Sequence, residues 1–138
     1  MKFPEEYIKR EGRVLHSRQS SDIFYDVEEA ITDNDVYDFM MLNFPFYEHY
    51  VGIATGGALM AIVAHSQYPS SEFSYIKNGK LIGKKPVEEW VLIDDVATTG
   101  KSLLEAIALV GSEPKKIIVA IDRRIENKNP EVRAIFEI

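Results

Sequence analysis

The chain has 138 residues, of which 46% are hydrophobic and 28% charged, and its formal net charge is −6. This length suits one domain with a buried core, residues 1–138, and the acidic balance argues against a protein that binds nucleic acid. The chain has no cysteine, no apolar run long enough to cross a membrane and no apolar signal core near Met1, so we expect a cytoplasmic protein without disulfides.

The first elements in chain order are short. Residues 4–11 predict a short helix, and residues 14–16 and 22–25 predict two extended segments. A longer helix is predicted from about Thr32, because Asp33 can cap it, and Pro45 argues against its extension beyond Asn43. The apolar positions of this helix are Val36, Phe39, Met40 and Leu42.

A strand is predicted over residues 50–54, followed by a glycine turn and a helix that runs to about His65. Gly56 and Gly57 permit positive φ angles and a close approach by a ligand, and a helix N-terminus directs free N–H groups to the same place. Taken alone, such a turn is more often a tight connection than a binding site. A second turn of the same kind on one sheet would favour an anion site.

Residues 73–84 predict a hairpin. Asn78-Gly79 is the favoured pair for a two-residue turn of type I′, and alternating residues flank it on both sides. Lys77 and Lys80 stand on either side of the turn. Lysines in this position are candidates to balance the charge of an anionic ligand, although solvated surface lysines are equally common.

The segment from Val91 to Ser102 contains the second turn. An apolar strand to Ile93 is followed by Asp94 and Asp95, by a small hydroxyl-rich turn and by a helix that Gly111 is expected to end. The predicted apolar stripe of this helix consists of Leu103, Leu104, Ile107, Ala108 and Val110. The helix N-terminus and its dipole favour an anion at the turn.

These residues describe a ligand with two different ends. The turn suits a phosphate, whereas the acidic pair suits neutral hydroxyls or a divalent metal, and a ribose 5-phosphate fits both. A P-loop needs a glycine where Asp95 stands, so a nucleoside triphosphatase is disfavoured. The simplest alternative is a capped turn with solvated aspartates.

The last strands are predicted over residues 117–121 and 132–137. Strands that alternate with helices predict an α/β fold with a mainly parallel sheet, and ligands then bind at the carboxyl ends of the strands. Arg123 directly follows one of these strands, and its planar guanidinium can bind a carboxylate or a ring carbonyl. The neighbouring Arg124 is the less favoured candidate for this contact.

The segment from Val91 to Ser102 resembles the phosphoribosyl-diphosphate (PRPP) signature of type I phosphoribosyltransferases. The resemblance implies that family's fold, a mainly parallel sheet flanked by helices with a small N-terminal hood over about residues 1–30. It also implies that Asp94 and Asp95 hold the ribose and that Mg²⁺ is held mainly by the substrate, with these carboxylates at most in its outer shell. The residues implied to bind the ribose and 5-phosphate are Asp94, Asp95, Val96, Ala97, Thr98, Thr99, Gly100, Lys101 and Ser102, and those implied to bind pyrophosphate are Ala54, Thr55, Gly56 and Gly57.

The segment 15–26 resembles the N-terminal segment of orotate phosphoribosyltransferases. The matching residues are Ser17, Ser21, Phe24, Tyr25 and Asp26, whereas His16 stands where that subfamily usually has lysine and Arg18 where it usually has glycine. The resemblance implies a base pocket that includes His16, Phe24, Tyr25 and Arg123. Many 6-oxopurine enzymes carry an aspartate at the position of Thr98, which disfavours that subfamily.

The largest departure from the orotate enzymes lies in their catalytic loop. Lys77 and Lys80 align with two lysines of that loop, but Ile76 replaces an arginine and an Asp-His-Gly stretch is missing. The resemblance implies that Lys77, Lys80, Asp94 and Asp95 are catalytic, that PRPP and orotate are substrates and that the protein is a homodimer. Two alternatives remain, a phosphoribosyltransferase for a purine or another base, and a PRPP-binding regulatory protein with little catalysis.

Overall fold

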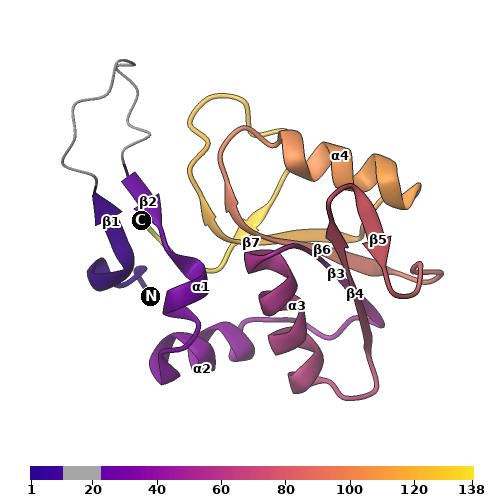
Figure 1. Cartoon of the computed structure of the whole chain (residues 1–138), viewed down its shortest axis with the longest axis horizontal. Helices are drawn as coiled ribbons and strands as arrows, with labels where there is room; N and C mark the ends of the chain where they lie inside the picture. The colour runs from indigo at the N-terminus through magenta and orange to yellow at the C-terminus, as the bar shows by residue number, and fades with distance from the viewer. Residues whose placement is uncertain (11–22) are drawn as a thin grey trace.

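The main sheet is mixed and mainly parallel (Figure 1). The computed structural model describes residues 1–10 and 23–138, and within them six strands have the order β5-β4-β3-β6-β7-β8. β4 (Glu72–Lys77), β3 (His49–Ile53), β6 (Trp90–Ala97), β7 (Lys116–Asp122) and β8 (Arg133–Ala134) are parallel, and β5 (Lys80–Ile82) is antiparallel to β4. The predicted α/β class is confirmed.

Helices cover both faces of this sheet (Figure 1). α1 (Val27–Ala30), α2 (Asn34–Leu42) and α3 (Gly56–Gln67) lie on one face, and α4 (Lys101–Val110) lies on the other. Along β6, Val91 and Ile93 pack into the core beneath α3, whereas Leu92 packs into the core beneath α4. Successive strand residues point to opposite faces, so a strand between two helical layers is apolar throughout.

The predicted helix near Thr32 is confirmed as α2. The Asp33 carboxylate accepts the N–H of Asp35 at 2.9 Å and caps the helix, and Asn43 ends it. Leu42 is 70% exposed and therefore lies outside the core, contrary to its predicted place on the apolar face. The pattern also missed α1, where Asp26 accepts the N–H of Glu29 at 3.0 Å, as an N-cap residue does.

The predicted apolar stripe of α4 is partly wrong. Leu103 and Val110 are buried together with Ala106, which the stripe omitted, whereas Leu104 is 49% exposed and Ala108 is exposed. Ile107, which the stripe included, is half-buried against the same core, so the row that faces the sheet consists of residues three and four apart. Gly111 ends the helix with a φ of 87°, as predicted.

The N-terminal residues form a separate ribbon beside the main sheet (Figure 1). β1 (Ile8–Arg10) pairs antiparallel with β2 (Ile23–Tyr25), with Ile8 opposite Tyr25. The predicted extended segment 22–25 is confirmed for its described residues 23–25. In the described part of the predicted helix over 4–11, only the 3-10 turn η1 (Glu5–Tyr7) is helical. The predicted extended segment 14–16 lies outside the described residues.

The final strand is shorter than predicted. β8 contains only two residues, although Ile135 and Phe136 continue into the core and their N–H groups donate to Val119 and Ala120 on β7. The other predicted strands and the hairpin with its Asn78-Gly79 turn, where φ is 52° and 72°, are confirmed. None of the helices in the described ranges combines the length and apolarity needed to cross a membrane.

Candidate functional site

The acidic pair lies near the carboxyl end of β6. Asp94 is 8% exposed, and one of its carboxylate oxygens accepts the N–H of Asp95 at 2.8 Å. Asp95 is partly buried and accepts the N–H of Val96 at 2.8 Å in the same way. In each carboxyl group, one oxygen thus accepts a backbone N–H, and the second oxygen can take part in other interactions.

Burial raises the pKa of Asp94 from its ordinary value of 3.8 to about 8, and the neighbouring charge of Asp95 and a hydrogen bond between the two carboxyl groups add to the shift. Two carboxylates in contact cannot both ionise freely in a buried position. The pair is therefore arranged to gain from a ligand that brings hydroxyl donors or positive charge.

The glycine turn after β3 packs directly on the acidic pair. A methyl group on Gly56 would collide with the side chain of Asp95 and would lie only 2.8 Å from the Cβ of Asp95. A methyl group on Gly57 would lie 3.0 Å from the Cα of Asp94. Asp95 continues the row of Val91 and Ile93 that faces α3, which explains this contact. The first glycine turn therefore lies against the acidic pair that leads into the second turn, at the carboxyl ends of the neighbouring strands β3 and β6.

The second turn connects β6 to α4. Gly100 occupies the N-cap position with a φ of 87°, and no side chain caps the helix there. Thr98 and Thr99 are exposed, and the Thr99 hydroxyl accepts the N–H of Lys101 at 3.3 Å. The hydroxyls of Thr98 and Ser102 belong to the same turn, and a helix N-terminus of this kind suits an anion.

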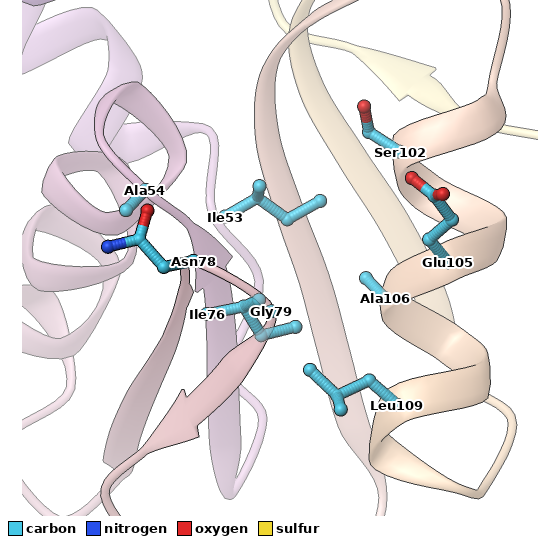
Figure 2. A pocket seen from close by; sticks show the side chains of 9 residues that line it. All are labelled: Ile53, Ala54, Ile76, Asn78, Gly79, Ser102, Glu105, Ala106 and Leu109. Carbon is cyan, nitrogen blue, oxygen red and sulfur yellow. The ribbon is translucent and has the colours of Figure 1, made fainter.

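A cavity of about 380 Å³ lies between this helix and the β4–β5 hairpin (Figure 2). Figure 2 shows the hairpin residues Ile76, Asn78 and Gly79 on one side and α4 on the other, and the side chain of Asn78 points towards Ala54 and away from α4. Its lining residues are Ile53, Ala54, Ile76, Asn78, Gly79, Ser102, Glu105, Ala106 and Leu109. The cavity thus joins members of both predicted turns to the hairpin.

The two hairpin lysines stand opposite each other, since Lys77 pairs with Lys80 across the strands, and both are exposed. The residues between them, Asn78 and Gly79, reach the cavity. The hairpin is therefore a short, closed turn, and each lysine projects from a regular strand.

Arg123 joins the carboxyl end of β7 to the N-terminal ribbon. Its guanidinium donates to the carbonyl of Ile23 at 3.1 Å and lies 5.3 Å from the ring centre of Tyr25. Phe24 is 55% exposed, because successive strand residues point to opposite faces and its neighbours Ile23 and Tyr25 face the core side of the ribbon. The structure thus brings Arg123 to Tyr25 but not to Phe24, and His16 lies outside the described residues.

Known proteins resemble this chain in sequence. A curated orotate phosphoribosyltransferase from Methanopyrus kandleri is 31% identical over 132 residues, which cover 80% of this chain and 68% of that protein. The chain belongs to the type I phosphoribosyltransferase family, on the side of its orotate enzymes. No protein-family model matches the chain.

Solved structures of type I phosphoribosyltransferases share the fold. The orotate phosphoribosyltransferase from Aeropyrum pernix is 25% identical with a TM-score of 0.68, and the match covers 86% of this chain and 77% of that one. The adenine phosphoribosyltransferase from Thermoanaerobacter pseudethanolicus is 17% identical with a TM-score of 0.58, over 72% of this chain and 76% of that one. The second likeness shows the fold alone.

The donor set of this phosphoribosyltransferase suits a magnesium ion held mainly by its ligand. Within the ranges 1–10 and 23–138, no group of three or more His, Cys, Asp or Glu side chains is arranged to hold a metal. Mg²⁺ keeps several waters and often binds one or two carboxylates together with substrate phosphates. Asp94 and Asp95, two carboxyl groups without a third beside them among the described residues, fit that limited role.

Sequence reasoning gave Arg124 only as a less favoured base contact and missed its buried contacts. Arg124, which follows the predicted base contact, is 5% exposed and binds Asp122 through two parallel hydrogen bonds, from Nε at 2.8 Å and from Nη2 at 3.1 Å. This pair holds the pKa of Asp122 below its ordinary value. The spacing Asp-x-Arg after a strand was visible, but a sequence does not show which side chains are buried together.

Proposed function

We propose that the chain transfers the phosphoribosyl group of PRPP to orotate, giving orotidine 5′-phosphate and pyrophosphate. The observation that carries the proposal is the contact between Asp95 and Gly56, which puts the acidic pair between two glycine-containing turns. One turn suits a phosphate, the other a pyrophosphate, and the carboxylates between them suit the ribose hydroxyls. PRPP has these three parts in this order.

In this proposal each part of PRPP has its own residues. The 5-phosphate binds the turn from Thr98 to Ser102, at a helix N-terminus that suits an anion. The ribose hydroxyls bind Asp94 and Asp95, and the burial that raises the pKa of Asp94 makes hydroxyl donors favourable there. Pyrophosphate binds the turn from Ala54 to Gly57 at the N-terminus of α3.

Two observations support orotate as the base: the position of Arg123 and the names of the relatives. A guanidinium can bind the carboxylate and a ring carbonyl of orotate through a planar pair of hydrogen bonds. Tyr25 lies against Arg123 and would stack beside the base, with His16 as a further proposed contact, whereas Phe24 is exposed on the other side of the ribbon. The relative from Methanopyrus kandleri and the structure from Aeropyrum pernix are both orotate phosphoribosyltransferases.

The proposed reaction needs positioning and charge balance more than covalent chemistry. As the bond from the ribose carbon to pyrophosphate breaks, that carbon gains positive character. The ring nitrogen of orotate, its proton already lost to water, attacks the carbon, and pyrophosphate leaves with the bonding electrons. The two turns hold both ends of PRPP in place, and Lys77 and Lys80 balance the charge of the leaving group. Magnesium, when bound, supplies further neutralisation of the pyrophosphate.

The decisive test follows orotate absorbance with PRPP and Mg²⁺. We expect turnover by the wild type, and its loss in Asp95→Asn with the fold intact by circular dichroism. Asp38→Asn, which changes an exposed carboxylate on α2, is the matched control and should keep full activity. Turnover of adenine or guanine but not of orotate would refute the base assignment, and sedimentation would test the homodimer that the resemblance implies.

The hairpin favours a second candidate, a PRPP-binding regulatory protein with little catalysis. Asn78-Gly79 closes β4 and β5 by a two-residue turn, so the hairpin itself offers no long loop to cover a substrate and exclude water. Calorimetry with PRPP separates the two candidates. Binding without pyrophosphate release for any base would support the regulatory protein.

A further inference from the structure

The turn that we assign to the 5-phosphate rests against another loop. A methyl group on Gly100 would lie 3.1 Å from the carbonyl oxygen of Asn129, 3.5 Å from the ring of Pro130 and 3.6 Å from Nη1 of Arg124. Gly100 is buried, whereas Thr98 and Thr99 on the same turn are exposed. The support of this turn from behind therefore includes the segment 129–130.

That segment is held by Arg124. Its Nη1 donates to the carbonyl of Pro130 at 2.6 Å, while Nε and Nη2 bind the two oxygens of Asp122 at the end of β7. Residues 125–129, which connect the two ends of this clamp, are exposed. One buried guanidinium thus links the rigid end of a strand to the segment behind Gly100.

The strand end is itself tied to the turn. The N–H of Arg123 donates to the carbonyl of Ala97 at 2.8 Å, and Ala97 pairs with Asp122 across β6 and β7. The paired ends of β6 and β7 therefore connect the phosphate turn to the clamp, which consists of Asp122, Arg124 and Pro130. A guanidinium can make these three side-chain hydrogen bonds at once because its donors are spread in a fixed plane, which a lysine cannot reproduce.

We infer that Arg124 is a positioning residue that holds the turn from Thr98 to Ser102 in its phosphate-binding shape by fixing Pro130 against Gly100. The inference rests on the proposed function, because it assumes that this turn binds the 5-phosphate of the donor. Arg124 touches no substrate in this role. Its effect is confined to one end of the ligand, since the pyrophosphate turn packs on the acidic pair instead.

The test compares two ligands on one protein. In Arg124→Lys, the Kd for ribose 5-phosphate measured by calorimetry should rise about tenfold, which corresponds to roughly one weakened hydrogen bond to a charged group. The Kd for pyrophosphate should stay unchanged, and a purely structural role would not produce this split. Arg133→Lys, which changes an exposed arginine on β8, should alter neither Kd.

Asp122→Asn is the second variant, because it weakens the same clamp while it keeps Arg124 and its bond to Pro130. It should shift the Kd for ribose 5-phosphate in the same direction, and it decides the matter if Arg124→Lys does not fold. Unchanged affinity for ribose 5-phosphate in a folded variant, or a parallel loss for both ligands, would overturn the inference. A wild type that binds pyrophosphate but no ribose 5-phosphate would instead overturn the proposed function, and the inference with it.

Discussion

The replacement Asp94→Asn should stabilise the fold at alkaline pH while it weakens PRPP binding. Burial and Asp95 raise the pKa of Asp94 from 3.8 to about 8, so between these values the folded state keeps a proton that the unfolded state has lost. Folding stability therefore falls as the pH rises through this window. The asparagine cannot ionise, and its side-chain oxygen can still accept the N–H of Asp95.

The size of the effect follows from the shift. The interval from pH 5 to pH 8 covers about three pH units of this window. At about 1.36 kcal/mol per unit, the free energy of unfolding of the wild type falls by at most about 4 kcal/mol over this interval. Relaxation and water entry reduce such penalties, so we expect the stability of Asp94→Asn relative to wild type to grow by about 1–2 kcal/mol from pH 5 to pH 8.

Urea denaturation without divalent cations measures this difference. Trp90 is the single tryptophan and is 1% exposed, so its fluorescence reports unfolding in both proteins. The comparison at pH 5 is the internal control, because the titration penalty is small there. A stability difference that stays flat with pH, or that turns against the variant at pH 8, would refute the burial of a protonated Asp94.

Two further substitutions test the contacts described above. Gly56→Ala puts a methyl group into Asp95, so turnover should fall by about 100-fold or more through misplaced ribose contacts. Gly111→Ala is the control, because Gly111 has a φ of 87° but lies away from the site. It should lower only the free energy of unfolding, by about 1–2 kcal/mol. Activity retained by Gly56→Ala would contradict the close packing of the two motifs. Trp90→Phe removes the indole that donates to Ser112 at 3.0 Å and should cost about 1–2 kcal/mol by urea denaturation followed by circular dichroism, whereas no loss would mean that the core repacks without it.

The local patterns of this sequence predicted the elements that carry their own signals. Asp33 before an apolar period, Asn78-Gly79 between alternating residues and Gly111 after α4 each act through neighbours in the chain, and each feature is present in the structure. Elements that depend on distant packing were predicted less well. Leu104 matched a helical stripe yet is exposed, because only the sheet decides which row of α4 is buried.

The sequence by itself determined the composition of the candidate site, because strand, turn and helix N-terminus are contiguous in each motif. Only the tertiary structure decided that Asp95 lies on Gly56 and that Arg123 reaches Tyr25, since these pairs are far apart in the chain. It also brought Arg124, which sequence alone left as the less favoured of two arginines, into contact with Asp122 and Pro130. Hydrogen bonds local to the chain can be predicted from spacing, whereas a buried clamp becomes visible only when the fold brings its partners together.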